Sequence, residues 1–328
     1  MSARHAGRAA AFAVACLFLA VAGRAMAQPC CVSTGSADFA LVGRYEKAVL
    51  ATMFSYEAAT GRYDTDAEYE RLDSVVARDL VWTIGGGIRP IEAFSAWQIY
   101  AAVPLREQYR ELEGLPAARS YGIGDASAGT RVTITEDNLN GLGRGAPADF
   151  IPFLDLGFGV KFPTGRPPEE SEEPTGSDQM GDGAWEYTPG ITMTKFVTPA
   201  HALTLDYAYG YRPERTIPAS GPGVPDQRFD PGDAQSVKAS WLFIPHARWS
   251  VGVNSSWRLT APARMNDVEI PDSMTFRWRV GASGMWIFAY PFWDVRLAVA
   301  GDPWWKGAGF NLPFVGPTAS IQLRRNFR

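Results

Sequence analysis

Cysteine, histidine and long apolar runs are scarce in this chain of 328 residues. Three cysteines are too few for a disulfide scaffold, and three histidines leave few candidates for a catalytic base. After residue 23 no run of about 18 apolar residues occurs, which excludes an ordinary transmembrane helix. Aromatic and turn-forming residues are abundant instead, with 11 Trp, 12 Tyr, 18 Phe, 33 Gly and 24 Pro. The length allows two domains or one large β-barrel, and this composition favours the barrel.

The first 27 residues predict a secretory signal peptide that is removed after residue 27. Arg4 and Arg8 give a basic start, residues 9–22 form an apolar core, and residues 25–27 fit the small-x-small pattern of a cleavage site. The alternative, lipid attachment at Cys16, leaves too short an apolar core. Cleavage removes three of 31 basic residues, so 28 basic and 35 acidic residues remain, a net charge of −7. This negative charge disfavours nucleic acid as a partner.

Cys30 and Cys31 are the cysteines that remain after this cleavage, and they are adjacent. They suggest an intermolecular or vicinal disulfide, a metal contact, or simply two cysteines in a flexible periplasmic tail. Their position directly behind the cleavage site favours the tail. We expect residues 28–44 to form this short periplasmic segment.

Alternating apolar and polar residues predict strands, and the clearest pair encloses an acidic loop. Large apolar side chains alternate with Asp155, Gly157, Gly159 and Lys161 before the loop, and residues 185–197 alternate in the same way after it. Most such segments are close to the length of about 9–11 residues that a tilted membrane strand needs. The candidate strands are 45–58, 76–89, 93–103, 123–135, 151–162, 185–197, 202–212, 233–243, 248–259, 273–286, 293–300 and 314–327.

The connections between these segments alternate between long and short, except for 136–150. With the N-terminus in the periplasm, the long connections are outer loops and the short ones periplasmic turns. Aromatic residues gather near both sets, as they do at two membrane interfaces. A soluble sheet whose core is capped by aromatics does not explain an apolar face on every strand. Because lipid cannot satisfy backbone polar groups, residues 45–328 predict an all-β, closed antiparallel transmembrane β-barrel of about 12 strands, within a range of 10–14.

Short glycine-rich motifs around the acidic loop resemble a known group of outer-membrane proteins. The motifs are residues 122–125 (GIGD), 159–165 (GVKFPTG), 175–176 (TG), 181–185 (GDGAW) and 189–190 (PG). Together they resemble the family named "MetA-pathway of phenol degradation", with residues 177–180 interrupting its spacing. The resemblance covers about residues 120–328. It implies an outer-membrane barrel that transports hydrophobic or aromatic compounds.

Charged residues on the polar faces of the strands predict the lining of the barrel lumen. Arg277, Arg279, Arg296 and Arg324 fall on neighbouring strands and predict a basic ladder, with Asp294 as the acid among them. This ladder either attracts anions or carboxylate groups, or pairs across the lumen with Asp155, Glu186 and Asp206. The candidate lining residues are Arg277, Arg279, Arg296, Arg324, Arg258, Lys161, Asp155, Glu186 and Asp206.

The acidic loop between the candidate strands 151–162 and 185–197 carries six carboxylates. They are Glu169, Glu170, Glu172, Glu173, Asp178 and Asp182. Oxygen ligands suit Ca²⁺, or a divalent bridge to lipopolysaccharide, but the spacing matches no metal-binding motif. Solvated surface charge is the simpler interpretation.

An enzyme is the least favoured function. A lipid hydrolase needs a base such as histidine at the outer membrane surface, whereas His201 and His246 fall in predicted periplasmic turns. The sequence predicts a passive channel or carrier for small hydrophobic, aromatic or anionic solutes in the outer membrane of a Gram-negative bacterium, without a cofactor. A structural or adhesive barrel without an open pore is the alternative. Expected partners are outer-membrane lipid, lipopolysaccharide, the barrel-assembly machinery and a small-molecule solute.

Overall fold

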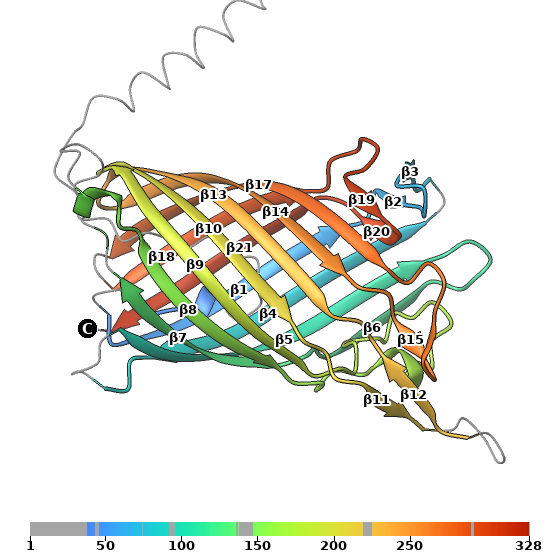
Figure 1. Ribbon diagram of the computed structural model, residues 1–328. Coiled ribbons are helices and arrows are strands. Elements are labelled where there is room, and N and C mark those ends of the chain that lie inside the picture. Colours follow the sequence, from blue (N-terminus) through green and yellow to red (C-terminus); the bar gives the residue numbers. More distant parts are fainter. Residues whose placement is uncertain are drawn as a thin grey trace, which may run out of the picture.

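The chain forms a closed antiparallel β-barrel, and twelve strands surround the lumen within the described residues (Figure 1). The computed structural model describes residues 38–42, 46–73, 75–91, 96–135, 137, 147–218, 225–289 and 292–327. The predicted fold class is therefore confirmed, whereas the predicted signal peptide and Cys30 and Cys31 lie outside the described residues. The wall consists of β1 (Ala48–Ala58), β4 (Val76–Ile88), β5 (Trp97–Glu111), β6 (Ala118–Ile123) with β7 (Ser127–Thr135) as one interrupted strand, β8 (Phe153–Lys161), β9 (Glu186–Thr198), β10 (His201–Gly210), β13 (Ala234–His246), β14 (Trp249–Thr260), β17 (Thr275–Ala289), β18 (Trp293–Gly301) and β21 (Thr318–Phe327).

Each strand of the wall pairs with its neighbours in the sequence, and the first pairs with the last. β1 lies between β4 and β21, so that Ala51 is opposite both Gly85 and Arg324. β14 pairs with β17 over its whole length, which joins the two halves of the sheet. The wall therefore has no free edge, as a strand-built membrane protein requires.

The predicted faces of the strands are confirmed on the hairpin formed by β8 and β9 and on the neighbouring strand β10. Phe158 on β8 and Leu205 on β10 are 44% and 42% exposed and point away from the lumen. The alternate residues point inward, where Asp155 accepts a hydrogen bond from Thr133 at 2.6 Å. An apolar outer face over the whole wall is the surface that a bilayer requires.

The two ends of the barrel differ, as the predicted connection lengths indicated (Figure 1). Short connections and the C-terminal end of β21 lie at one end, called here the turn end. At the other, the loop end, long connections carry short strands of their own and the turn η4 (Pro168–Glu170). These strands are β2 (Gly61–Tyr63), β3 (Tyr69–Arg71), β11 (Arg215–Ile217), β12 (Gln227–Asp230), β15 (Arg264–Met265), β16 (Val268–Glu269), β19 (Gly309–Phe310) and β20 (Leu312–Val315).

Three predicted strands differ most from the structure. The segment predicted to end at residue 103 continues as β5 to Glu111, because its inward side chains at the loop end contact a folded loop instead of solvent. The segment predicted to begin at residue 314 begins at Thr318, after Pro317, while β20 pairs with β2. The predicted strand 123–135 is interrupted at residues 124–126, opposite Pro104, which has no N–H to donate to the ladder.

Residues 38–42, which include the turn η1 (Asp38–Ala40), lie inside the lumen near the turn end. Inward side chains of the wall bind their backbone: Gln322 donates to the Phe39 carbonyl at 3.1 Å and Arg324 to the Leu41 carbonyl at 2.8 Å. A Cβ at Gly87 would overlap the Ala40 carbonyl oxygen and one at Gly85 would lie 2.9 Å from the Phe39 ring, so β4 has glycine where the segment approaches most closely. The lumen is therefore occupied on this side by the chain's own N-terminal segment.

Aromatic side chains surround both ends of the barrel, as predicted. At the turn end Trp241 stacks with Phe243, and Phe288 with Trp293, while Tyr187 and Tyr211 stack at the loop end. The turn η3 (Pro147–Phe150) precedes β8 and exposes Phe150 by 61%. None of the helical segments that the structure describes is long and apolar enough to cross a membrane.

Candidate functional site: a charged cavity in the lumen

A cavity of about 820 Å³ occupies the lumen between residue Leu41 and the loop end. Side chains from most of the wall reach it, and its basic groups outnumber its acidic groups. The basic side chains are Arg106, Arg131, Lys161, Arg212, Lys238, Arg258, Arg277 and Arg279, and the acidic ones are Asp182, Glu186 and Asp206. Six of the nine predicted lining residues therefore meet at one cavity: Arg258, Arg277, Arg279, Lys161, Glu186 and Asp206.

The connection between β8 and β9 folds into the loop end of the lumen. Arg106 donates to the Met180 carbonyl at 3.0 Å, and Gln108 donates to the Gln179 carbonyl at 2.9 Å. Both side chains point inward from β5, so their partners lie inside the barrel mouth. Residues 177–180, which interrupt the family-like spacing, form this inserted part, and Ser177 is fully buried.

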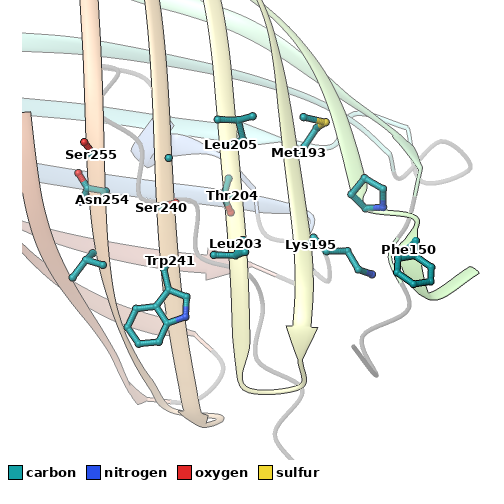
Figure 2. A pocket seen from close by; sticks show the side chains of 13 residues that line it. Phe150, Met193, Lys195, Leu203, Thr204, Leu205, Ser240, Trp241, Asn254 and Ser255 are labelled. Carbon is teal, nitrogen blue, oxygen red and sulfur yellow. The ribbon is translucent and has the colours of Figure 1, made fainter. Parts of the chain in front are cut away.

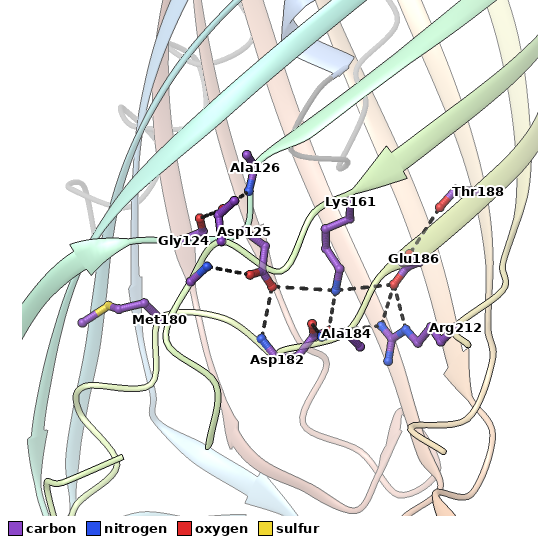
Figure 3. Close-up of polar contacts among 12 residues, drawn as sticks. Gly124, Asp125, Ala126, Lys161, Met180, Asp182, Ala184, Glu186, Thr188 and Arg212 are labelled. Carbon is purple, nitrogen blue, oxygen red and sulfur yellow. Dashed lines mark hydrogen bonds and ion pairs between the residues drawn. The ribbon is translucent and has the colours of Figure 1, made fainter. Parts of the chain in front are cut away.

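Asp125 joins this loop to the interruption between β6 and β7 (Figure 3). Its carboxylate accepts hydrogen bonds from the backbone N–H groups of Gly165 at 3.0 Å and Asp182 at 3.1 Å. Thr164 adds a second link, since its hydroxyl donates to the Gly124 carbonyl at 2.7 Å. Three of the glycine-rich motifs, far apart in sequence, thus meet around one carboxylate.

Lys161 and Glu186 continue this network into the cavity (Figure 3). The Lys161 ammonium pairs with Asp182 and lies 3.7 Å from Glu186 and 3.9 Å from Asp125. Arg212 pairs with Glu186 at 2.7 Å, and Arg258 approaches the same carboxylate at 3.3 Å. One buried carboxylate is therefore shared by three cations.

A second charged cluster lies beside the first, since Arg277 on β17 is directly opposite Arg258 on the neighbouring strand β14. Arg277 forms a two-point contact with Asp302, at 2.7 and 2.8 Å, and donates to Glu57 at 2.5 Å. Arg279 donates to Thr318 and lies 3.8 Å from Asp302. The two arginines share two acids, so the cluster carries no net charge.

The remaining predicted lining residues lie at other heights in the lumen. Arg296 pairs with Asp294 at 3.1 Å, and Arg324 lies 3.6 Å from Glu46, near the N-terminal segment. Asp155 lies 3.6 Å from Arg131. The two interpretations of the arginine ladder left its partners open, and the described ion pairs of these arginines are with Glu57, Asp302, Asp294 and Glu46.

Sequence reasoning missed several members of the site. Asp302 lies in a connection, where no alternation pattern marks a side chain as inward. Arg212 ends the predicted strand 202–212 on its polar face but was not among the candidate lining residues. Asp125 and Asp182 belong to the glycine-rich motifs, so the resemblance was the signal that pointed to them.

The acidic loop is only partly a solvated surface. Glu169 pairs with Arg215, Asp178 with Arg166 at 2.9 Å, and Asp182 with Lys161, while Glu170, Glu172 and Glu173 are exposed. Within the described part of the chain no group of three or more His, Cys, Asp and Glu side chains is arranged to hold a metal ion. Half of the six carboxylates therefore bind cations of the protein itself.

Acid should loosen this loop through Asp178. Burial alone would raise the pKa of Asp178, but hydrogen bonds from Ser171, the Glu172 N–H and Arg166 outweigh burial and lower the pKa to about 2. The unfolded value is about 3.9, so the stabilising contribution is complete above about pH 4 and is lost as the pH falls towards 2. The rate at which pepsin cuts within residues 163–185, divided by its rate on an unfolded reference peptide, should rise as the pH falls from 4.5 to 2.

Asp178→Asn provides the control for this pH dependence. The variant should be cut rapidly already at pH 4.5, since the amide cannot carry the charge that binds Arg166. A wild-type cleavage rate that stays flat from pH 4.5 to 2 would contradict the assignment.

The outer wall has a groove of about 680 Å³ that belongs to the apolar face (Figure 2). Met193, Leu203 and Trp241 line it beside Phe150. Lys195 also lines it, and its ammonium pairs with Asp137 at 2.5 Å. The groove therefore lies outside the lumen, and its cation is neutralised.

His201 and His246 lie at the turn end, as predicted. His201 begins β10 and stacks against both Trp241 and Phe243, with ring centroids 5.4 and 4.9 Å away. His246 ends β13 and accepts a hydrogen bond from the Arg248 N–H at 3.2 Å. Both contacts are those of interfacial and turn residues.

Solved structures share this barrel. A crystal structure of an outer membrane channel from Pseudomonas putida F1 matches with a TM-score of 0.65 and 10% sequence identity, over 86% of this chain and 96% of that chain. The NanC porin is more distant, with a TM-score of 0.42 and 8% identity over 85% of this chain and 99% of that chain. The CymD monoaromatic hydrocarbon channel matches with a TM-score of 0.41 and 10% identity over 86% of this chain and 89% of that chain. No protein-family model and no curated protein sequence matches this chain. The first structure shows that the fold is that of an outer-membrane barrel.

Proposed function

We propose that this protein is an outer-membrane channel that passes small polar solutes, anions among them, through the lumen cavity. The observation that carries the proposal is the cavity itself, which lies inside a closed barrel and is lined by more basic than acidic side chains. The apolar outer face supports insertion in a membrane, and the long connections at the loop end support an orientation with that end outside. The resemblance to the MetA-pathway family supports transport and leaves the solute open.

A barrel without an open pore is the second candidate. Residues 38–42 lie in the lumen near one end of the cavity, and residues 177–182 occupy the other. If both segments stay in place, the protein serves a structural or adhesive role. Planar-bilayer recordings separate the two functions, because a channel gives current steps in KCl and a permanently closed barrel is silent.

Filling the cavity tests the path of the solute. Gly159 faces the cavity from β8, and a Cβ there meets its nearest neighbour, on Thr188, at 3.7 Å, so Gly159→Leu adds a side chain that leaves the backbone without a clash at its Cβ. The added side chain should reduce single-channel conductance roughly by half, since it narrows the pore. The conductance is measured in planar bilayers with protein that shows the wild-type shift between folded and heated forms on a gel.

Gly284→Leu is the matched control on the opposite face. Gly284 points outward from β17, and a Cβ there meets its nearest neighbour, on Ser250, at 3.8 Å. The same substitution at this position should leave the conductance unchanged. Equal conductance in both variants and the wild type would show that ions bypass this cavity.

A further inference from the structure

Arg258 differs from the other charged side chains of the lumen wall by its exposure. Its side chain points inward from β14 and is 49% exposed. The next most exposed lumen-facing arginine among those described in ion pairs is Arg106, at 29%, followed by Arg277 at 26% and Arg279 at 21%. Arg258 lines the cavity and lies near the loop end of β14, so among these arginines its guanidinium is the one most open to a solute that enters the lumen.

The acid that Arg258 contacts is already bound by other cations. The Oε2 oxygen of Glu186 lies 2.8 Å from Nε and 2.7 Å from Nη2 of Arg212. The same oxygen lies 3.7 Å from the Lys161 ammonium. Arg258 reaches this same oxygen through one nitrogen at 3.3 Å. A guanidinium has five N–H donors, and this single long contact uses one of them.

The other arginines of the cavity are held differently. Arg277 has a two-point contact with Asp302 and a further bond to Glu57, and Arg131 contacts both Asp155 and Thr192. These contacts fix the side chains against the wall. Arg258 pairs with Glu186, which it shares with Arg212 and Lys161. If Arg258 turns away, Glu186 therefore remains paired with these two cations.

We propose that Arg258 binds the carboxylate group of solutes that enter the cavity. This inference rests on the proposed channel function and names its preferred solute class as small carboxylates. A carboxylate matches the guanidinium fork with two parallel hydrogen bonds, which is a stronger contact than the single bond to Glu186. Gly157, Gly159 and Gly190 line the same cavity and leave room for the body of the solute.

Uptake of two solutes of equal size tests the assignment. Gluconate and sorbitol differ in one terminal group, a carboxylate in the first and a hydroxymethyl in the second, and neither crosses lipid unaided. In proteoliposomes at low solute concentration, wild-type protein should take up gluconate faster than sorbitol. Arg258→Gln should lower the gluconate-to-sorbitol ratio about tenfold, the loss expected for a hydrogen bond between charged groups. Arg258→Lys, which keeps the charge without the fork, should give an intermediate ratio.

Arg110→Gln is the control for the loss of one positive charge inside the barrel. Arg110 points inward from β5, pairs with Asp79 at 2.7 Å and does not line the cavity. The gluconate-to-sorbitol uptake ratio of Arg110→Gln should equal that of the wild type. If Arg258→Gln keeps the wild-type ratio while both solutes enter, the inference is overturned and the channel function stands. If wild-type protein admits neither solute, the channel function itself is overturned.

Discussion

Asp302→Ala should destabilise the barrel by about 3–5 kcal/mol, the usual effect of removing one partner of a buried ion pair. The Asp302 side chain is 2% exposed and accepts hydrogen bonds from Arg277 and from the Gly316 N–H at 3.0 Å. Without it, Arg277 and Arg279 retain only Glu57 as a nearby acid of this cluster. Two partly buried guanidinium groups on β17 would then share one carboxylate, that of Glu57 on β1.

Urea unfolding in lipid vesicles, followed by tryptophan fluorescence, measures this effect. Asp302→Asn should fall between the wild type and the alanine variant, because the amide oxygen still accepts hydrogen bonds but carries no charge. Glu214→Ala is the control, since Glu214 pairs with Arg228 in an exposed loop where an ion pair contributes little. If the midpoints of Asp302→Ala and Glu214→Ala coincide, the cluster does not stabilise the barrel as argued.

The same acid illustrates which parts of the structure the sequence could predict. Period-2 alternation identified the wall, because the outer face must be apolar on every strand, and it placed Arg277 and Arg279 inward. It could not supply their partner, because Asp302 lies in a connection where backbone direction changes from residue to residue. Partners of charged groups in a lumen depend on which connections fold inward, and no local pattern encodes that.

The interrupted strand shows a second limit. The sequence placed Pro104 just after a predicted strand and residues 124–126 inside another, and only the pairing of β5 with β6 and β7 shows that they lie opposite one another. That interruption places Asp125 where it binds the loop from β8 to β9. The glycine-rich motifs marked the right residues, while the contact between them is a property of the three-dimensional fold.

The lumen segment could likewise be inferred only in part. Three consecutive glycines at 85–87 weaken a strand on propensity alone and suggest a close approach of another part of the chain. The structure identifies the approaching part as residues 38–42, with Val42 donating its N–H to Gln98 at 2.7 Å. Sequence alone left open whether the lumen is open, or occupied by loops or by the N-terminal segment.

Leu205→Arg should destabilise the barrel in a bilayer by about 2–4 kcal/mol, the range for a charge on the lipid face near the midplane. Leu205 lies in the middle of β10 between Met193 and Ala239 and is 42% exposed. In a soluble protein, an exposed leucine is replaced by arginine with little effect, because both side chains are in water. A large effect at an exposed position is therefore a specific sign of lipid contact.

Tyr211→Arg is the matched control at the loop end of the same hairpin. Tyr211 is 51% exposed and stacks with Tyr187 at the predicted membrane interface, where an arginine costs only about 0–1 kcal/mol. Urea unfolding of both variants in vesicles should show the larger shift for Leu205→Arg. In a bilayer the two positions differ in depth, whereas in a soluble barrel both are exposed to water and differ only by the weak stacking of Tyr211. Equal shifts of the unfolding midpoint in the two variants would therefore contradict a membrane-spanning wall.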